Sequence, residues 1–312
     1  MNKKIIFIAI LLTVTFVSGC TQEIEQPVIA RESRIPSDIE KGTPANDNYP
    51  PILHSDEFEN PVPLAVINTA GAEDSPFIPA DKNEMYFFFT PDVRVPVEKQ
   101  ILDQVTGIYV SKNINGAWQE PERVILKISG KLSLDGCTFV QGNAMLFCSA
   151  REGYTGVHWF TAEYKNGEWV NWRNADFHPE YEVGELHIHG DELYYHSPKE
   201  GGKGGTDIWI LTQVDGEWVN PVNVAIINSE ENEGMPYITP DGNELWFNRW
   251  YLGSPAVYRS KKVNNLWQEP ELIISQFAGE PTLDKDGNVY FVHHYYEDGV
   301  MIEADIYVAF RK

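Results

Sequence analysis

Short apolar stretches separated by polar turns recur along the chain from about residue 60 to the C-terminus. They are rich in aromatic and β-branched residues, and Asp-Gly, Asn-Gly and Gly-Gly turns separate them, which is typical of β-strands. No apolar pattern with a period of 3.6 residues lasts longer than a turn or two. The chain is therefore predicted to be all-β. The clearest stretches are 85–87, 145–147, 193–195, 245–247 and 289–291.

A repeated phrase gives the length of the structural unit. A turn followed by tryptophan ends at Trp118, Trp169, Trp218 and Trp267, which lie 51, 49 and 49 residues apart. In addition, residues 220–247 repeat much of the text of residues 60–87 without a gap. A fixed period of this kind indicates a repeat protein, and the chain holds five such units.

Each unit has room for four strands, which in the fourth unit are predicted at 236–239, 244–248, 256–262 and 271–274. Four-stranded units with a period of 40 to 50 residues predict a β-propeller, here with five blades. The last unit lacks a predicted fourth strand. Residues 61–67, at the start of the repeat region, have a sequence that matches the fourth-strand position of another unit. We therefore expect the N-terminal strand to complete the last blade, which removes two exposed sheet edges.

Two longer stretches carry a resemblance to a known family. They are residues 193–209, which end in Asp-Ile-Trp, and residues 232–242, which contain Asn-Glu-Gly-Met-Pro and Pro-Asp-Gly. Both resemble the WD40-like, TolB-type propeller repeat. The resemblance covers residues 61–312 and is weakest in the second unit. It implies the propeller architecture, whereas the functions of that family range from periplasmic protein interaction to accessory domains of hydrolases.

The N-terminus has the features of an export signal. Lys3 and Lys4 precede an apolar run of about thirteen residues, which is too short to span a bilayer. The following Val-Ser-Gly-Cys resembles the lipobox of prokaryotic lipoproteins, which implies cleavage of residues 1–19 and acylation of Cys20. The alternatives are a plain signal peptide or an N-terminal anchor with an incidental cysteine. The lipobox predicts a membrane-anchored protein at the cell surface or in the periplasm.

Residues 20–59 are rich in Pro, Glu, Asp, Ser and Asn and are predicted to form a flexible acidic tether ahead of a propeller at 60–312. The whole chain has 24 basic and 46 acidic side chains and a formal charge of −22. This charge makes nucleic acid and anionic lipid headgroups poor partners, and it also favours solubility outside the cell. We expect a monomer that binds a protein or a carbohydrate and needs no cofactor.

Acidic residues gather where the first strand of each unit begins. The first strands of a propeller line its central channel, so these residues predict a ring of carboxylates at one channel mouth, where a cation such as calcium or a polyol could bind. Arg151 and Arg249, expected in loops after the second strands, are further ligand-binding candidates. A structural interpretation also fits, because Glu73 and Glu233 belong to the repeated sequence motif. Their carboxylates could accept hydrogen bonds from backbone amides where one unit joins the next. The acids are Glu73, Asp74, Asp135, Glu185, Glu233 and Glu280.

A second resemblance suggests an alternative function. Five-bladed glycosidases of the arabinanase and xylosidase clan carry Asp, Asp and Glu on the first strands of their first three blades. Asp74, Asp135 and Glu185 match this order by residue type, although Glu185 is displaced by one alignment position. The resemblance implies a glycoside hydrolase in which these residues serve as base, modulator and acid. The main interpretation remains a binding module.

Histidine and cysteine give two further candidates. His187 and His189 alternate on one predicted strand and therefore point to the same side, as a metal site would require. Hydrogen bonding or exposure to solvent is the other explanation for the pair. Cys137 and Cys148 lie opposite each other if the turn is centred on residues 142–143. A cross-strand disulfide and two free thiols both remain open.

Overall fold

The computed structural model describes residues 29–126, 130–177 and 182–312. In these ranges the chain is nearly all β, and its helices are a 3-10 turn at Arg31–Arg34 and the one-turn α1 (Val97–Gln100). Neither helix has the length and apolar character needed to cross a bilayer. The predicted signal peptide, the lipobox and Cys20 lie outside the described residues.

Twenty strands of the described chain pair in five antiparallel groups that follow one another in sequence. Each group has four members, and consecutive members of a group pair with each other. They are β3 (Ala72–Phe77), β4 (Glu84–Thr90), β5 (Gly107–Ile114) and β7 (Glu122–Arg123); β8 (Ser133–Gln141), β9 (Ala144–Arg151), β10 (Val157–Lys165) and β11 (Glu168–Asn174); β12 (Leu186–His189), β13 (Glu192–Ser197), β14 (Asp207–Val214) and β15 (Glu217–Asn223); β16 (Glu233–Ile238), β17 (Glu244–Tyr251), β18 (Ser254–Val263) and β20 (Glu271–Ser275); β21 (Ala278–Leu283), β22 (Val289–Glu297), β23 (Val300–Ala309) and β2 (Val62–Pro63).

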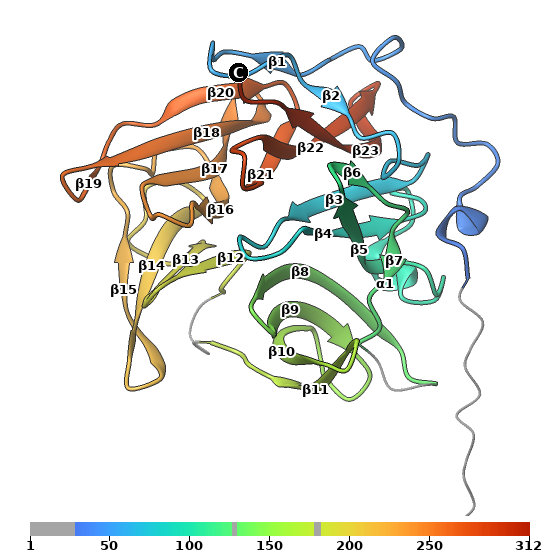
Figure 1. The fold of residues 1–312 in the computed structure, drawn as a ribbon, viewed down its shortest axis with the longest axis horizontal. Helices are drawn as coiled ribbons and strands as arrows, with labels where there is room; N and C mark the ends of the chain where they lie inside the picture. The colour runs from blue at the N-terminus through green and yellow to red at the C-terminus, as the bar shows by residue number, and fades with distance from the viewer. Residues whose placement is uncertain (1–28, 127–129, 178–181) are drawn as a thin grey trace, which may run out of the picture.

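The first strands of the five groups lie side by side in a cycle. Strand β3 contacts β8, β8 contacts β12, β12 contacts β16, β16 contacts β21, and β21 contacts β3. Figure 1 shows these strands nearer the middle of the molecule, with β11, β15 and β20 at its periphery. Residues at the start of the first strands are thereby brought close together.

The two ends of the repeat region meet in the fifth group. Val62 pairs with Val308 and Pro63 with Tyr307, so β2 adds to β23 as the sequence predicted for residues 61–67. A single parallel bridge between Ala304 and Ala72 links β23 to β3 of the first group. The shorter strands β6 (Ala117–Trp118) and β19 (Leu266–Trp267) extend β5 and β18 as hairpins.

The second strands form the centre of the core. The ten first and third residues of the apolar triplets point to one face of each strand and are fully buried. The middle residues Tyr86, Tyr194, Trp246 and Tyr290, which point to the other face, are buried as well, so these strands are buried on both faces. Neighbouring groups cover both faces of each sheet, which explains why the sequence shows continuous apolar triplets in these strands. The ten residues are Met85, Phe87, Met145, Phe147, Leu193, Tyr195, Leu245, Phe247, Val289 and Phe291.

The prediction of a flexible tether is wrong for residues 29–59. Strand β1 (Ile52–Leu53) pairs with β20, and Phe58, only 1% exposed, packs edge-on against Trp246 at 6.0 Å between ring centroids. Figure 1 shows this segment passing along β20 and β23 before it reaches β2. Its polar composition suggested disorder, but several of its charged side chains pair with buried groups of the sheets.

Candidate functional site

Four of the five first strands carry a bulge at the same place. The residues at these positions have positive φ, with values of 50°, 51°, 49° and 53° for Ser75, Cys137, Met235 and Glu280. The register of pairing with the second strand shifts at each of them. A bulge inserts one residue and turns the neighbouring side chains to a new direction. Periodicity of two therefore fails to predict which side chains face the centre.

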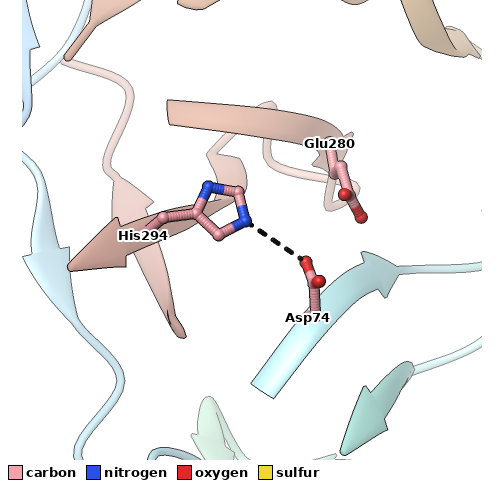
Figure 2. Close-up of side chains that lie close together, drawn as sticks. All are labelled: Asp74, Glu280 and His294. Atoms are coloured by element: carbon pink, nitrogen blue, oxygen red, sulfur yellow. Dashed lines mark ion pairs between the residues drawn. The ribbon is translucent and has the colours of Figure 1, made fainter. Parts of the chain in front are cut away.

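The bulges of β3 and β21 bring Asp74, Glu280 and His294 together. One ligand atom from each lies within 4.8 Å of the other two, and Nε2 of His294 lies 3.9 Å from Oδ1 of Asp74. Figure 2 shows the three side chains pointing toward one another from β3, β21 and β22. We call Asp74, Glu280 and His294 the central cluster. The sequence had placed Asp74 and Glu280 at the channel mouth, but it had not selected His294.

Burial favours the neutral forms of Glu280 and His294 in the central cluster. Burial, together with the nearby carboxylates of Asp74 and Glu185, raises the pKa of Glu280 well above its ordinary range. Burial lowers the pKa of His294, although Asp74 opposes this shift. A carboxylic acid that keeps its proton beside a neutral imidazole and a second carboxyl group can bind a cation after losing that proton, or can serve as a general acid.

Glu185 lies on the neighbouring side of the channel. Its Oε2 is 3.4 Å from Nε2 of His196, and Sγ of Cys137 lies 3.6 Å from its Oε1. Cys137 and Cys148 form a disulfide with a Cα–Cα distance of 5.2 Å, which decides between the two alternatives left open by the sequence. Because Cys137 occupies the bulge, Cys148 pairs with Gly136 in the ladder, one position away from the pairing that the sequence suggested.

Glu73 and Glu233 have a structural environment. Both are fully buried, and each carboxylate accepts hydrogen bonds from the backbone N–H and side-chain hydroxyl of the residue four positions earlier, Thr69 or Ser229. These contacts match the structural interpretation of these two acids. Burial raises the pKa of Glu73 to about 7, since desolvation outweighs the neighbouring positive charge of Arg31.

Arginine side chains neutralise the buried acids at this position of the repeat. Nη2 of Arg151 lies 2.7 Å from Oδ1 of Asp135, and Nε of Arg249 lies 2.7 Å from Oε1 of Glu233. Asp135 also accepts hydrogen bonds from Ser133 and Ser149. The prediction that Arg151 and Arg249 lie in loops is wrong, because they belong to β9 and β17, and their side chains pair with these acids.

Asp135 consequently does not join the predicted set of Asp74, Asp135 and Glu185. In the ladder Asp135 corresponds to Glu73 and Glu233, whereas the position of Asp74 corresponds to Gly136. The ring of six acids thus divides into two kinds. Glu73, Asp135 and Glu233 are held by arginine, and Asp74, Glu185 and Glu280 lie near one another.

His187 and His189 each bond to the backbone of the fourth group. Nδ1 of His187 accepts a hydrogen bond of 2.6 Å from the N–H of Ile238, and the ring stacks on Tyr237 at 4.7 Å. Burial, with a smaller contribution from His189, lowers the pKa of His187 to about 3. Nε2 of His189 lies 3.1 Å from the carbonyl oxygen of Pro240. These contacts support the hydrogen-bonding explanation of the pair and not the metal site.

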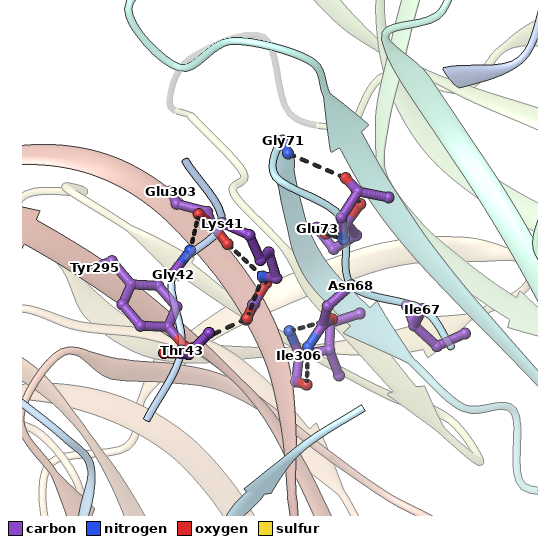
Figure 3. Close-up of polar contacts among 12 residues, drawn as sticks. Lys41, Gly42, Thr43, Ile67, Asn68, Gly71, Glu73, Tyr295, Glu303 and Ile306 are labelled. Carbon is purple, nitrogen blue, oxygen red and sulfur yellow. Dashed lines mark hydrogen bonds and ion pairs between the residues drawn. The ribbon is translucent and has the colours of Figure 1, made fainter. Parts of the chain in front are cut away.

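The N-terminal segment supplies charges that the sequence analysis missed. Lys41 Nζ forms ion pairs with Glu303 and with Asp305, the latter at 2.5 Å, and Gly42 N–H donates to Glu303 at 2.7 Å. Figure 3 shows Lys41, Gly42 and Glu303 beside Tyr295 of β22. Burial raises the pKa of Asp305, and Lys41 opposes this.

A contact between Asp47 and His293 completes this set. Nε2 of His293 lies 2.8 Å from Oδ2 of Asp47, and both side chains are almost fully buried. We call residues 29–59 the N-terminal strap, because Arg31, Lys41 and Asp47 all contact buried polar side chains of the first and fifth groups.

The arrangement defines a β-propeller. No family model matches the chain, and no curated protein matches it. Solved structures are similar to it at low identity. An endo-arabinase from Bacteroides thetaiotaomicron is 14% identical, with a TM-score of 0.50 over 78% of this chain and 95% of that chain. At this level of identity the likeness shows the fold alone.

Two further solved structures have lower scores. The Bacteroides ovatus xyloglucan PUL protein GH43B is 14% identical, with a TM-score of 0.49 over 80% of this chain and 54% of that chain. TolB from Acinetobacter baumannii is 11% identical, with a TM-score of 0.46 over 78% of this chain and 55% of that chain. This chain thus spans about half the length of either protein.

Proposed function

We propose that this chain is an exported, lipid-anchored, five-bladed β-propeller that binds a protein or a glycan at the mouth of its central channel. The anchor rests on the resemblance of residues 17–20 to a lipobox. The number of blades is supported by the five antiparallel groups, and closure by the cycle of contacts among the first strands and by the pairing of β2 with β23. The predicted monomeric state belongs to the same proposal.

The observation that carries the binding function is the separation of the acids into two kinds. The chain supplies its own cation to Glu73, Asp135 and Glu233, so these acids stabilise the fold. Asp74 and Glu185 are partly exposed, with side-chain exposures of 28% and 29%, and none of the ion pairs of the described residues joins them to Lys or Arg. Partly exposed carboxyl groups on rigid strands suit hydroxyl or cationic groups of a ligand.

A glycan array and a pull-down against envelope proteins test this proposal. The full-length chain should bind a defined ligand, and Asp74→Asn and Glu185→Gln should each weaken binding at least tenfold while the circular dichroism spectrum stays unchanged. Glu168→Gln serves as the matched control, because Glu168 is exposed on the outer strand β11. Equal binding by all four proteins would exclude the channel mouth as the binding site.

A glycoside hydrolase is the second candidate, and one observation favours it. Oxygen atoms of Asp74 and Glu280 lie within 4.8 Å of each other, close to the carboxyl separation of roughly 5 Å typical of retaining glycosidases. The raised pKa of Glu280 would suit the acid. In this proposal Glu280 takes part, and Asp135 does not.

The two candidates separate in an assay of hydrolysis. If the chain is a hydrolase, it cleaves at least one member of a panel of arabinose- and xylose-based substrates, and Glu280→Gln or Glu185→Gln abolishes the cleavage. If no substrate is cleaved but a ligand raises the melting temperature, the binding function stands and the hydrolase is excluded.

A further inference from the structure

We infer that the central cluster of Asp74, Glu280 and His294 is a binding site for a divalent transition-metal cation, with Zn²⁺ as the best match. The inference goes beyond the proposed ligand binding and does not depend on it. In the described part of the chain, this is the one set of three His, Cys, Asp or Glu side chains whose ligand atoms lie within 4.8 Å of one another. The three residues come from three different strands.

A tetrahedral zinc site requires the three ligand atoms of the central cluster to move closer together. Zinc binds nitrogen and oxygen at about 2.0–2.1 Å, so its ligand atoms lie roughly 3.3 Å apart. The 3.9 Å between Nε2 of His294 and Oδ1 of Asp74 must shorten by about 0.6 Å, and the other separations, which are at most 4.8 Å, by at most about 1.5 Å, through side-chain rotations. Figure 2 shows both carboxyl groups and the ring directed into one common space.

The central cluster has no positively charged partner among the described residues. Glu73, Asp135 and Glu233 each have an arginine within 2.9 Å, whereas no described ion pair joins Asp74 or Glu280 to Lys or Arg. Within the described structure, Oε2 of Glu280 is buried and has no hydrogen-bond partner. Since an enclosed polar atom without a partner is unfavourable, a bound cation would satisfy it.

The imidazole decides which kind of cation fits. Nε2 is the nitrogen of His294 that faces Asp74, and the backbone N–H of His294 donates to the carbonyl oxygen of Phe277 at 2.9 Å. One imidazole nitrogen with two carboxylate oxygens favours Zn²⁺ over Ca²⁺, which prefers an all-oxygen set. The sulfur atoms of Cys137 and Cys148 are already bonded to each other.

Calorimetric titration of the chelator-treated full-length chain with ZnCl₂ tests the inference, with CaCl₂ as the comparison. The chain should bind one equivalent of zinc, and it should bind zinc at least tenfold more tightly than calcium. His294→Gln and Asp74→Asn should each weaken zinc binding more than tenfold. Replacement of zinc by Co²⁺ should produce a visible absorption band that His294→Gln removes, which reports directly on the imidazole.

His189→Gln is the matched control, because it removes a partly buried histidine of β12 whose ring contacts Pro240 and not the central cluster. This variant should bind zinc like the unchanged chain. Three results would overturn the inference: no stoichiometric zinc, calcium bound as tightly as zinc, or zinc binding by His294→Gln equal to that of His189→Gln. If the chain binds no zinc but still binds a glycan or protein ligand, the zinc inference is wrong and the proposed function stands.

Discussion

Nη1 of Arg31 lies 2.9 Å from Oε1 of Glu73, a residue 42 positions later in the chain. Arg31 also donates from Nη2 to the carbonyl oxygen of Ile67 and stacks over the ring of Phe87. Arg249 makes the equivalent contacts in the fourth group, with Glu233, Ile227 and Phe247. The strap thus supplies to the first group the cation that the fourth group carries on its own second strand.

Replacement of Arg31 by methionine should destabilise the chain by about 3–5 kcal/mol at pH 8, because it leaves the carboxyl group of Glu73 buried without a cation. The folded-state pKa of Glu73, about 7, is above the ordinary 4.5. The favourable contribution of the protonated group is therefore present below pH 4.5 and is lost as pH rises through 7. The loss caused by Arg31→Met should accordingly be larger at pH 8 than at pH 4.5.

Denaturant unfolding at both pH values measures this effect. Arg34→Met, at an exposed residue of the same 3-10 turn, is the control and should change the free energy of unfolding by less than about 0.5 kcal/mol. Adding Glu73→Gln to Arg31→Met should recover part of the loss. Equal stability of Arg31→Met and Arg34→Met would contradict the role of this ion pair in stability.

Loss of the disulfide should also lower stability. Cys137 and Cys148 are 11 residues apart, and closing a loop of this length in the unfolded chain corresponds to about 2–3 kcal/mol. The double variant Cys137→Ser with Cys148→Ser should lose about this amount in denaturant unfolding. Alkylation of the unreduced, denatured chain followed by mass spectrometry provides the check, since modification of either residue would mean that the bond is absent.

Glu57 should make the stability sensitive to acid. Hydrogen bonding to Arg259, 2.6 Å away, lowers the pKa of Glu57 from 4.5 to about 2. The stabilising contribution of this group is present above pH 4.5 and is lost as pH falls through about 2. In Glu57→Gln that contribution is missing, so the difference in free energy of unfolding from the unchanged chain should shrink between pH 4.5 and 2.

Thermal unfolding across this pH range gives the measurement for Glu57. Glu59→Gln is the control, because Glu59 is exposed two residues later, and its difference from the unchanged chain should not vary with pH. A difference for Glu57→Gln that stayed constant from pH 6 to pH 2 would show that the Arg259 contact does not stabilise the charged carboxylate.

The strap should behave as part of the core. Phe58 is 1% exposed and packs on Trp246, so Phe58→Ala should cost about 3–5 kcal/mol through lost burial and the cavity that remains. Tyr49 lies in the same segment but is 44% exposed, and Tyr49→Ala should cost less than about 1 kcal/mol. If both substitutions had equally small effects in denaturant unfolding, residues 29–59 would be a tether after all.

The central cluster was only partly predictable. Asp74 and Glu280 could be placed near the mouth of a channel because both occur where a first strand begins. His294 could not be selected, because the bulges at Ser75 and Glu280 set the final direction of the neighbouring side chains. Bulges depend on pairing with another strand, and a period of two residues does not contain that information.

A sequence signal for the Arg31 contact did exist. Arg151 and Arg249 each follow their buried acid by sixteen residues, whereas the residue sixteen positions after Glu73 is Phe89. This gap in the repeat could have shown that Glu73 needs a cation from elsewhere. It could not show that Arg31 provides the cation, because residues 29–59 lack the apolar periodicity from which structure is read.

The sequence by itself determined the all-β class, because strand pattern and turn chemistry are local properties. It also predicted that residues 61–67 pair with the last unit, because their sequence matches that of a fourth strand elsewhere in the chain. The tertiary structure alone decided which acids are neutralised by arginine, which face the centre, and that the N-terminal strap packs on the sheets. Those outcomes depend on the relative position of groups far apart in the chain. A buried charge is stabilised by the opposite charge that the fold places in contact with it. Spacing along the sequence does not specify which residue provides that opposite charge.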